Sequence, residues 1–231
     1  MSIRVLPSSD RYAVCPYEGS VLSFFEGTFE AAYVLLHPFL RPHSISIHQF
    51  QSETYPSREQ ICKSCDAVTW ADLQRLSGLK SINEVDIALR TRIGGLKSNF
   101  TRLELAKTLK TALETEGIVE PDEGSFSELT HNKVLTFIQS QGYEWVWIGD
   151  EFCTERKLHW IEDLKAPDSE ATQQQHCNVF TPDKKLLWTT HWDSHFSFFC
   201  GSHHTVKALA HDANFEGFEC SQSTEVYWSV R

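Results

Sequence analysis

The amino-acid sequence changes its periodicity at Gly142, and this change constrains the fold more than any other feature. Before Gly142, apolar residues recur at helical spacing; after it, short apolar runs rich in Val, Trp, Phe and Thr alternate with turn-forming residues. We therefore predict an α+β protein, with a helical part over residues 1–141 packed on a mostly antiparallel sheet over residues 142–231. Because the long helices need that sheet to cover their apolar faces, we expect one domain over residues 1–231.

Several helices are predicted in the first part. Apolar spacing indicates a buried helix over Ser20–Leu36, and an alternating run over residues 45–50 indicates a short strand. Hydroxyl residues predict three further helix starts, two of them with a glutamate three residues later as in a capping box. These starts are Thr69, Ser81 with Glu84, and Thr101 with Glu104. The last helix should end at Gly117, and another is predicted over Phe126–Ser140.

The sequence of residues 142–231 predicts β-hairpins. Two runs, YEWVWIG and RKLHWIEDL, flank a turn at Gly149-Asp150-Glu151, and a second hairpin joins CNVF to LLWTT across TPDKK. We expect the chain from Leu187 to Cys200 to form one extended strand. Ser202 should cap a short helix, and FEGFEC and EVYWSV should form the last strands.

Charge and composition exclude some classes of protein. The net charge of -10 is uneven, with 14 basic and 17 acidic residues through Ser140 against 7 and 14 after it. Such a field repels nucleic acid and anionic lipid and favours a basic protein partner. No apolar run reaches the ~20 residues that span a bilayer, and the start of the chain lacks a secretory pattern. With seven scattered cysteines, we expect a cytoplasmic protein with free thiols and no membrane contact.

Four of the 11 histidines fall between Thr189 and His204. On a straight strand, His191 and His195 would lie about 13 to 14 Å apart, too far for one zinc ion. If the chain instead turned at Trp192-Asp193-Ser194, the two imidazoles could face each other, with Asp193 orienting one of them. We favour a surface or turn role, and the alternative is a zinc site formed by His191, Asp193 and His195.

Other candidate chemistry is weaker. Cys62 and Cys65 have the spacing of a zinc or redox pair, for which His176 and Cys177 are candidate remote ligands. A basic run from Arg90 to Lys110 lacks a phosphate-loop pattern and is predicted to be a solvated helix face. No nucleophile motif is present, so the sequence predicts no catalytic residues.

Aromatic and acidic residues of the second part form the predicted binding surface. Exposed tryptophans on an acidic surface would anchor a basic partner, because aromatic residues often dominate interface energetics. The candidate binding residues are Trp145, Trp147, Asp150, Glu151, Trp192 and Asp193.

The run CNVFTPDKKLLWTTHWDSHFSFFCGSHH, followed by FEGFECSQSTEVYWS, resembles an uncharacterised bacterial family of unknown function. It also looks like immunity proteins of bacterial toxin systems, and the resemblance covers the last third of the chain. It implies a small acidic cytoplasmic protein that occludes a toxin, without catalytic residues. We expect no cofactor, and the alternative is zinc.

We therefore expect a non-enzymatic bacterial binding protein, an immunity-type inhibitor whose partner is a basic protein such as a toxin. One alternative is a metal-dependent enzyme with zinc at His191, Asp193 and His195. Another is a structural module that forms a homodimer through an exposed strand edge.

Overall fold

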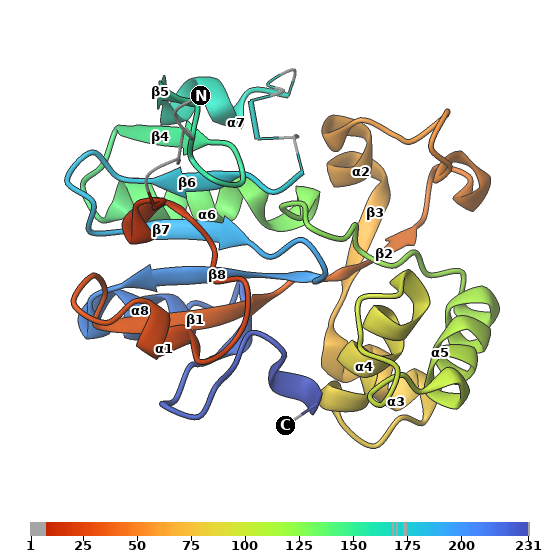
Figure 1. Ribbon diagram of the computed structural model, residues 1–231. Helices are drawn as coiled ribbons and strands as arrows, with labels where there is room; N and C mark the ends of the chain where they lie inside the picture. The colour runs from red at the N-terminus through yellow and green to blue at the C-terminus, as the bar shows by residue number, and fades with distance from the viewer. Residues whose placement is uncertain (1–7, 168, 170, 173–174, 231) are drawn as a thin grey trace, which may run out of the picture.

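A seven-stranded antiparallel sheet organises the computed structural model, with the strand order β5-β4-β6-β7-β8-β1-β9 (Figure 1). The structure describes residues 8–167, 169, 171–172 and 175–230. The strands of this sheet are β1 (Ala31–Leu36), β4 (Trp145–Gly149), β5 (Arg156–Trp160), β6 (Asn178–Phe180), β7 (Leu187–Thr190), β8 (Phe196–Gly201) and β9 (Glu216–Glu219). The predicted α+β class is confirmed, as are both predicted hairpins.

The strand β1 lies inside the sheet between β8 and β9, although it belongs to the first part of the chain. The helix predicted over Ser20–Leu36 is therefore wrong: only α1 (Val21–Phe24) is helical there. All six residues of β1 are buried, because helices cover one face of the strand and the N-terminal and C-terminal segments cover the other. A strand buried on both faces has a continuous apolar run, which periodicity does not distinguish from a helix.

One face of the sheet is covered by α6 (Glu128–Ser140), α7 (Ile161–Lys165) and α8 (His203–Ala210), which lie behind it in Figure 1. Side chains that alternate along the strands, such as Val146, Val179 and Phe199, pack with Val134 and Leu209 of these helices. The helices predicted to end at Ser140 and to start at Ser202 are confirmed, and the Ser202 hydroxyl accepts from the Thr205 N–H at 3.1 Å.

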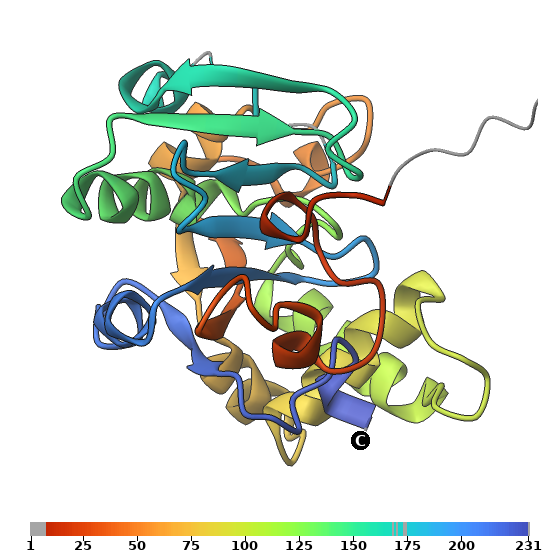
Figure 2. The same cartoon turned by 60° about the vertical axis from the view of Figure 1, so that its left-hand side comes forward.

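The other face packs against residues 11–29 and the C-terminal segment, and its core continues into a helical group at one end of the sheet (Figure 2). That group contains α3 (Trp70–Ser77), α4 (Ile82–Ile93) and α5 (Leu103–Glu116). Thr69 and Ser81 are the N-caps of α3 and α4, as predicted. The capping box predicted at Thr101 is wrong, because Arg102 is the N-cap of α5 and makes no capping hydrogen bond with its side chain.

The basic run is only partly a solvated face. Arg90 is fully buried and donates from Nε to Asp86 Oδ2 at 2.9 Å, while its guanidinium lies 4.5 Å from the ring centroid of Tyr227. The prediction of solvent exposure is thus wrong at this position. Spacing along a helix does not reveal that Val226 and Tyr227, far along the chain, cover this side of α4.

A small second sheet pairs β2 (Phe39–Pro42) with β3 (Cys65–Val68), and α2 (Arg58–Ser64) precedes β3. Two predicted strands are wrong. Residues 47–49 form the short 3₁₀ helix η2 (Ile47–Gln49), and the end of the chain forms η3 (Trp228–Val230) rather than a strand. A further 3₁₀ turn, η1 (Arg11–Ala13), lies near the start of the chain.

The chain from Leu187 to Cys200 is a hairpin, not one strand. β7 pairs with β8, with Thr190 opposite Ser197, and residues 191–195 form the turn between them. The Ser194 N–H donates to the His191 carbonyl oxygen at 3.2 Å, which closes this turn. The prediction of one extended strand is therefore wrong, and the alternative, a bend at Trp192-Asp193-Ser194, is present.

Candidate functional site

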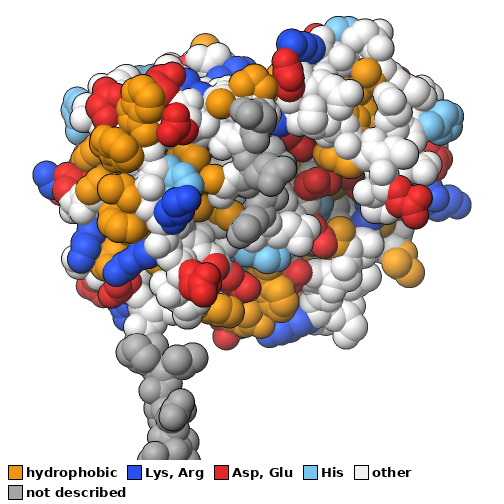
Figure 3. All heavy atoms as spheres, turned by 90° about the horizontal axis from the view of Figure 1, so that it is seen from above, with side chains coloured by type: hydrophobic (Ala, Val, Ile, Leu, Met, Phe, Trp, Pro, Cys, Tyr) orange, Lys and Arg blue, Asp and Glu red, His pale blue; other side chains and the backbone are white. Residues whose placement is uncertain are grey.

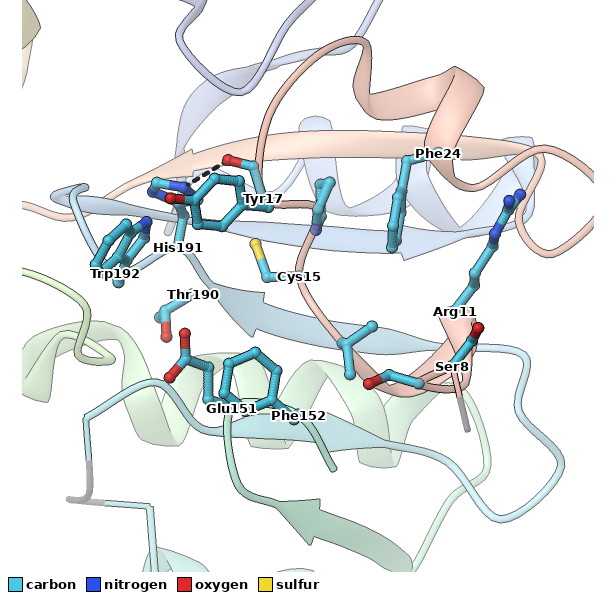
Figure 4. Close-up of a pocket in the computed structure, with 13 residues that line it drawn as sticks. Ser8, Arg11, Cys15, Tyr17, Phe24, Glu151, Phe152, Thr190, His191 and Trp192 are labelled. Atoms are coloured by element: carbon cyan, nitrogen blue, oxygen red, sulfur yellow. Dashed lines mark hydrogen bonds between the residues drawn. The ribbon is translucent and has the colours of Figure 1, made fainter. Parts of the chain in front are cut away.

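A pocket opens on the sheet face that the N-terminal segment covers. Its volume is about 330 Å³, and it lies between residues 8–17, the loop after β4 and the turn after β7 (Figure 4). Three of the residues singled out from the sequence, Glu151, His191 and Trp192, line it together. Tyr17 and Phe152 line it as well. This volume is at the lower end of the range for small-ligand sites.

His191 holds the N-terminal segment against the hairpin turn. Its Nδ1 accepts from the Asp193 backbone N–H at 3.2 Å, so the proton is on Nε2, which donates to the Tyr17 carbonyl oxygen at 3.0 Å (Figure 4). Burial lowers the pKa of His191 to about 3, with Arg90 adding to this effect. The imidazole is therefore neutral, and both ring nitrogens already have partners.

The pocket has an aromatic wall. The rings of Tyr17 and Trp192 lie with centroids 5.6 Å apart and an interplanar angle of 32°, and the His191 ring lies 6.2 Å from that of Trp192. Tyr17 is 63% exposed, Phe152 61% and Trp192 39%. Three large exposed aromatic side chains around one pocket form a surface that water covers in the absence of a ligand.

The two acids of the predicted turn have separate roles. Asp150 closes the loop between β4 and β5, because its carboxylate accepts from the Thr154 N–H at 2.7 Å and from the Glu155 N–H at 3.3 Å. Glu151, the next residue, is exposed and lines the pocket, where Figure 4 shows its side chain directed between Thr190 and Phe152. The predicted turn is confirmed. Of its two acidic residues, Asp150 closes the loop and Glu151 lines the pocket.

Cys15 lines the inner side of the pocket, and its thiol is not activated. Burial raises the pKa of the Cys15 thiol far above its ordinary value, although a hydrogen bond with Thr189 opposes the shift. A protonated thiol is a poor nucleophile and metal ligand.

The turn after β7 does not bring His195 and Asp193 into the pocket lining. His195 is buried on the far side of the turn, where its backbone carbonyl accepts from the His37 N–H at 3.2 Å. The Asp193 carboxylate accepts from the Tyr227 hydroxyl at 3.4 Å instead of orienting an imidazole. Within the described part of the chain, no group of three or more His, Cys, Asp or Glu side chains is placed to hold a metal ion.

The remaining candidate residues lie elsewhere. Trp145 is 49% exposed on β4, opposite Trp160 of β5, and the Arg156 guanidinium lies 6.0 Å from the ring centroid of Trp147. Cys62 and Cys65 are free thiols at the junction of α2 and β3. The tryptophans of β4 therefore belong to a surface outside the pocket.

Sequence reasoning missed Tyr17, Phe152 and Cys15. Tyr17 and Cys15 lie in a segment without periodicity, and contacts with the distant residues His191, Trp192 and Thr189 place them beside the hairpin. Phe152 follows Asp150 and Glu151 directly, so an aromatic residue within a polar turn was an available signal.

Comparison with known proteins assigns the chain to a protein family. The family model described as "Protein of unknown function (DUF2711)" matches residues 17–230. The chain belongs to the DUF2711 family. The resemblance to a family of unknown function is thus confirmed, and it covers most of the chain instead of the last third.

A relative of this DUF2711 chain is "Uncharacterized protein YwbB" of Bacillus subtilis (strain 168), which is 23% identical over 177 residues, or 75% of this chain and 77% of the relative. No solved structure matches the DUF2711 chain. Among its described helices, none has the length and apolar character needed to cross a membrane.

Proposed function

We propose that this DUF2711 chain is a non-enzymatic binding protein whose pocket beside His191 receives a cationic side chain of a basic protein partner. The observation that carries this proposal is the combination of three exposed aromatic rings, Tyr17, Phe152 and Trp192, with the carboxylate of Glu151 at one pocket. Aromatic faces attract ammonium and guanidinium groups, and a nearby carboxylate adds a direct charge interaction.

The charges around the pocket support a cationic occupant. The pocket's own cation, Arg11, lies 5.7 Å from the ring centroid of Phe24, at the end of the pocket away from Trp192 (Figure 4). His191 stays neutral at physiological pH because burial lowers its pKa to about 3, so it does not repel a cation. The net charge of -10 would also speed the approach of a basic protein.

Two features favour binding over catalysis. Both nitrogens of His191 are occupied by the Asp193 N–H and the Tyr17 carbonyl oxygen, so this imidazole has no free lone pair to act as a general base. The pKa of the Cys15 thiol is raised by burial, so the thiolate needed for attack is scarce. The metal-dependent enzyme with zinc at His191, Asp193 and His195 has less support than the binding protein.

The finer form of the proposal is an immunity-type inhibitor in a bacterial cytoplasm. An aromatic rim around a central pocket matches the usual arrangement of interface hot spots, in which a few buried anchors supply most of the affinity. A basic toxin would insert a lysine or arginine here, and Asp193 and the remaining acids would steer its approach.

Calorimetric titration with short peptides tests the pocket. We expect acetyl-Gly-Lys-Gly-amide or acetyl-Gly-Arg-Gly-amide to bind, and the norleucine analogue to bind at least tenfold more weakly. Trp192→Ala and Glu151→Gln should each weaken binding at least fivefold. Trp145→Ala is the matched control, because Trp145 is similarly exposed but lies outside the pocket. Equal binding of the norleucine peptide would contradict the proposal.

A second candidate function is self-association through β5. This strand ends the sheet, and the exposed side chains of Trp145, Leu158 and Trp160 lie on the β4–β5 hairpin. Figure 3, which looks down on this end of the molecule, shows hydrophobic side chains gathered among charged ones. Sedimentation of the wild type and of Leu158→Lys tests for a homodimer, and a monomer at all concentrations would exclude it.

A further inference from the structure

A second cavity, of about 260 Å³, lies between α2, the loop before α6 and Thr172. Polar side chains line it, in contrast to the aromatic pocket beside His191. Those that matter here are Tyr55, Arg58, Asp122, Glu128 and His131. They come from three separate stretches of the first 131 residues, and pairing of Leu40 with Val119 helps to hold the loop that carries Asp122.

Two carboxylates and a phenol form one side of this cavity. The Tyr55 hydroxyl donates to Glu128 Oε1 at 3.4 Å, and it also interacts with Asp122. Burial raises the pKa of Glu128 to about 7, and the charge of Asp122 contributes to the shift. Burial raises the pKa of Asp122 as well. The Tyr55 hydroxyl thus joins two neighbouring acids, the half-buried Glu128 and the exposed Asp122, whose negative charges repel each other.

The cation on the opposite side is directed elsewhere. Arg58 is 6% exposed, and its Nη2 donates to the carbonyl oxygens of Leu164 and Ala166, the former at 3.2 Å. Its Nη1 lies 3.1 Å from Nδ1 of His131, whose Nε2 lies 2.5 Å from the Thr172 hydroxyl. Burial lowers the pKa of His131 to about 4, so this imidazole is neutral. Arg58 thus braces the C-terminal end of α7, and its effect in lowering the pKa of Glu128 is outweighed by burial.

The two acids that line the cavity determine which charge a ligand can carry. Asp122 and Glu128 would repel an anion, whereas a cation would pair with the two carboxylates and donate hydrogen bonds to their oxygens and to the Tyr55 oxygen. A metal ion is not favoured, since no suitable group of three ligands occurs among the residues with described positions. An organic cation needs only one or two carboxylates and the remaining space.

We propose that this cavity binds a small organic cation, a primary ammonium or guanidinium compound, that pairs with Glu128 and Asp122. When the cation enters, the proton held by Glu128 leaves to solvent, and the resulting carboxylate forms the ion pair. The site is separate from the aromatic pocket beside His191 and does not depend on the function proposed for it.

Calorimetry with n-butylamine and agmatine at pH 6.5, in two buffers of different ionisation enthalpy, tests the site. We expect binding accompanied by release of a fraction of one proton, and at least tenfold weaker binding of the neutral analogue n-butanol. Glu128→Gln should abolish proton release and weaken amine binding at least tenfold, and Asp122→Asn should weaken it at least threefold. Glu59→Gln is the matched control, because Glu59 pairs with Lys63 on the solvent side of α2.

The aromatic pocket also attracts cations, so the titration is repeated in a Glu151→Gln, Trp192→Ala double variant. Amine binding with proton release that persists there, and disappears in Glu128→Gln, supports the second site. Binding that is lost in the double variant, or that is equal for n-butylamine and n-butanol, overturns the proposal. Circular dichroism confirms that each variant is folded, and Asp122→Asn changes an exposed side chain should Glu128→Gln misfold.

Discussion

The imidazole Nε2 of His191 lies 3.0 Å from the carbonyl oxygen of Tyr17, although 174 positions separate the two residues in the sequence. This contact joins the N-terminal segment to the turn between β7 and β8 and thereby forms one wall of the aromatic pocket. His191 therefore helps to hold Tyr17, and with it one wall of the candidate cation site, while both of its own ring nitrogens are paired within the protein.

His191→Ala should lower the free energy of unfolding by about 2 to 3 kcal/mol, because it leaves the Tyr17 carbonyl oxygen and the Asp193 N–H without their partner and opens a cavity. Urea denaturation measures the change. His204→Ala is the control, since His204 is exposed on α8 and its loss should change stability by less than about 0.5 kcal/mol. Equal stability of the two variants would show that the contact is not required.

Mild acid should destabilise the protein because four histidines are buried in the neutral form. Burial lowers the pKa of His37, His191 and His195 to about 3 and that of His131 to about 4. The unfolded chain, with histidine pKa values near 6.5, binds more protons between about pH 6.5 and pH 4. Stability should therefore be complete above pH 6.5 and fall by up to about 1.4 kcal/mol per pH unit for each histidine below it.

Glu128 opposes this trend in part. Its pKa is raised to about 7 by burial, so its contribution is present below the unfolded value of 4.5 and is lost as pH rises toward 7. Four histidines outweigh one glutamate, and urea midpoints should still fall from pH 7 to pH 5. In Glu128→Gln the fall should be steeper. A midpoint that does not change between pH 7 and pH 5 would rule out this account.

Removing one partner of the buried Arg90–Asp86 pair should lower the free energy of unfolding by about 3 to 5 kcal/mol, because the other charge remains buried without its partner. Asp86 also accepts from the Ser229 hydroxyl at 2.6 Å, so Asp86→Asn should loosen the C-terminal segment as well. Thermal unfolding of Arg90→Met measures this loss of stability. The exposed pair of Arg75 with Asp72 is the control, and Arg75→Met should cost less than about 1 kcal/mol.

Gly217→Ala should disrupt the pairing of β9 with β1. A Cβ atom at this position would lie 1.9 Å from the Val34 carbonyl oxygen and 2.6 Å from a ring carbon of Tyr33. Since backbone cannot move as freely as a flexible side chain, we expect a loss of more than about 2 kcal/mol. Hydrogen exchange of the β9 amides measures the local effect, and Glu219→Ala on the same strand should change it little.

Local sequence determined those elements whose signals lie within a few residues. Thr69 and Ser81 predicted the starts of α3 and α4, Gly117 predicted the end of α5, and Asp150 predicted the β4–β5 turn. In each case a backbone group needs a partner, or the chain needs a left-handed residue, at a fixed position. The α+β class followed from the change in periodicity at Gly142.

The tertiary structure alone decided the rest. β1 is a strand because β8 and β9 pair with it, and Arg90 is buried because the C-terminal segment covers it. The aromatic pocket exists because His191 binds Tyr17, and the polar cavity exists because Tyr55 and Asp122 meet Glu128. The sequence determined local conformation through neighbouring residues, whereas burial, pKa and site composition depend on contacts between residues far apart, which only the folded chain brings together.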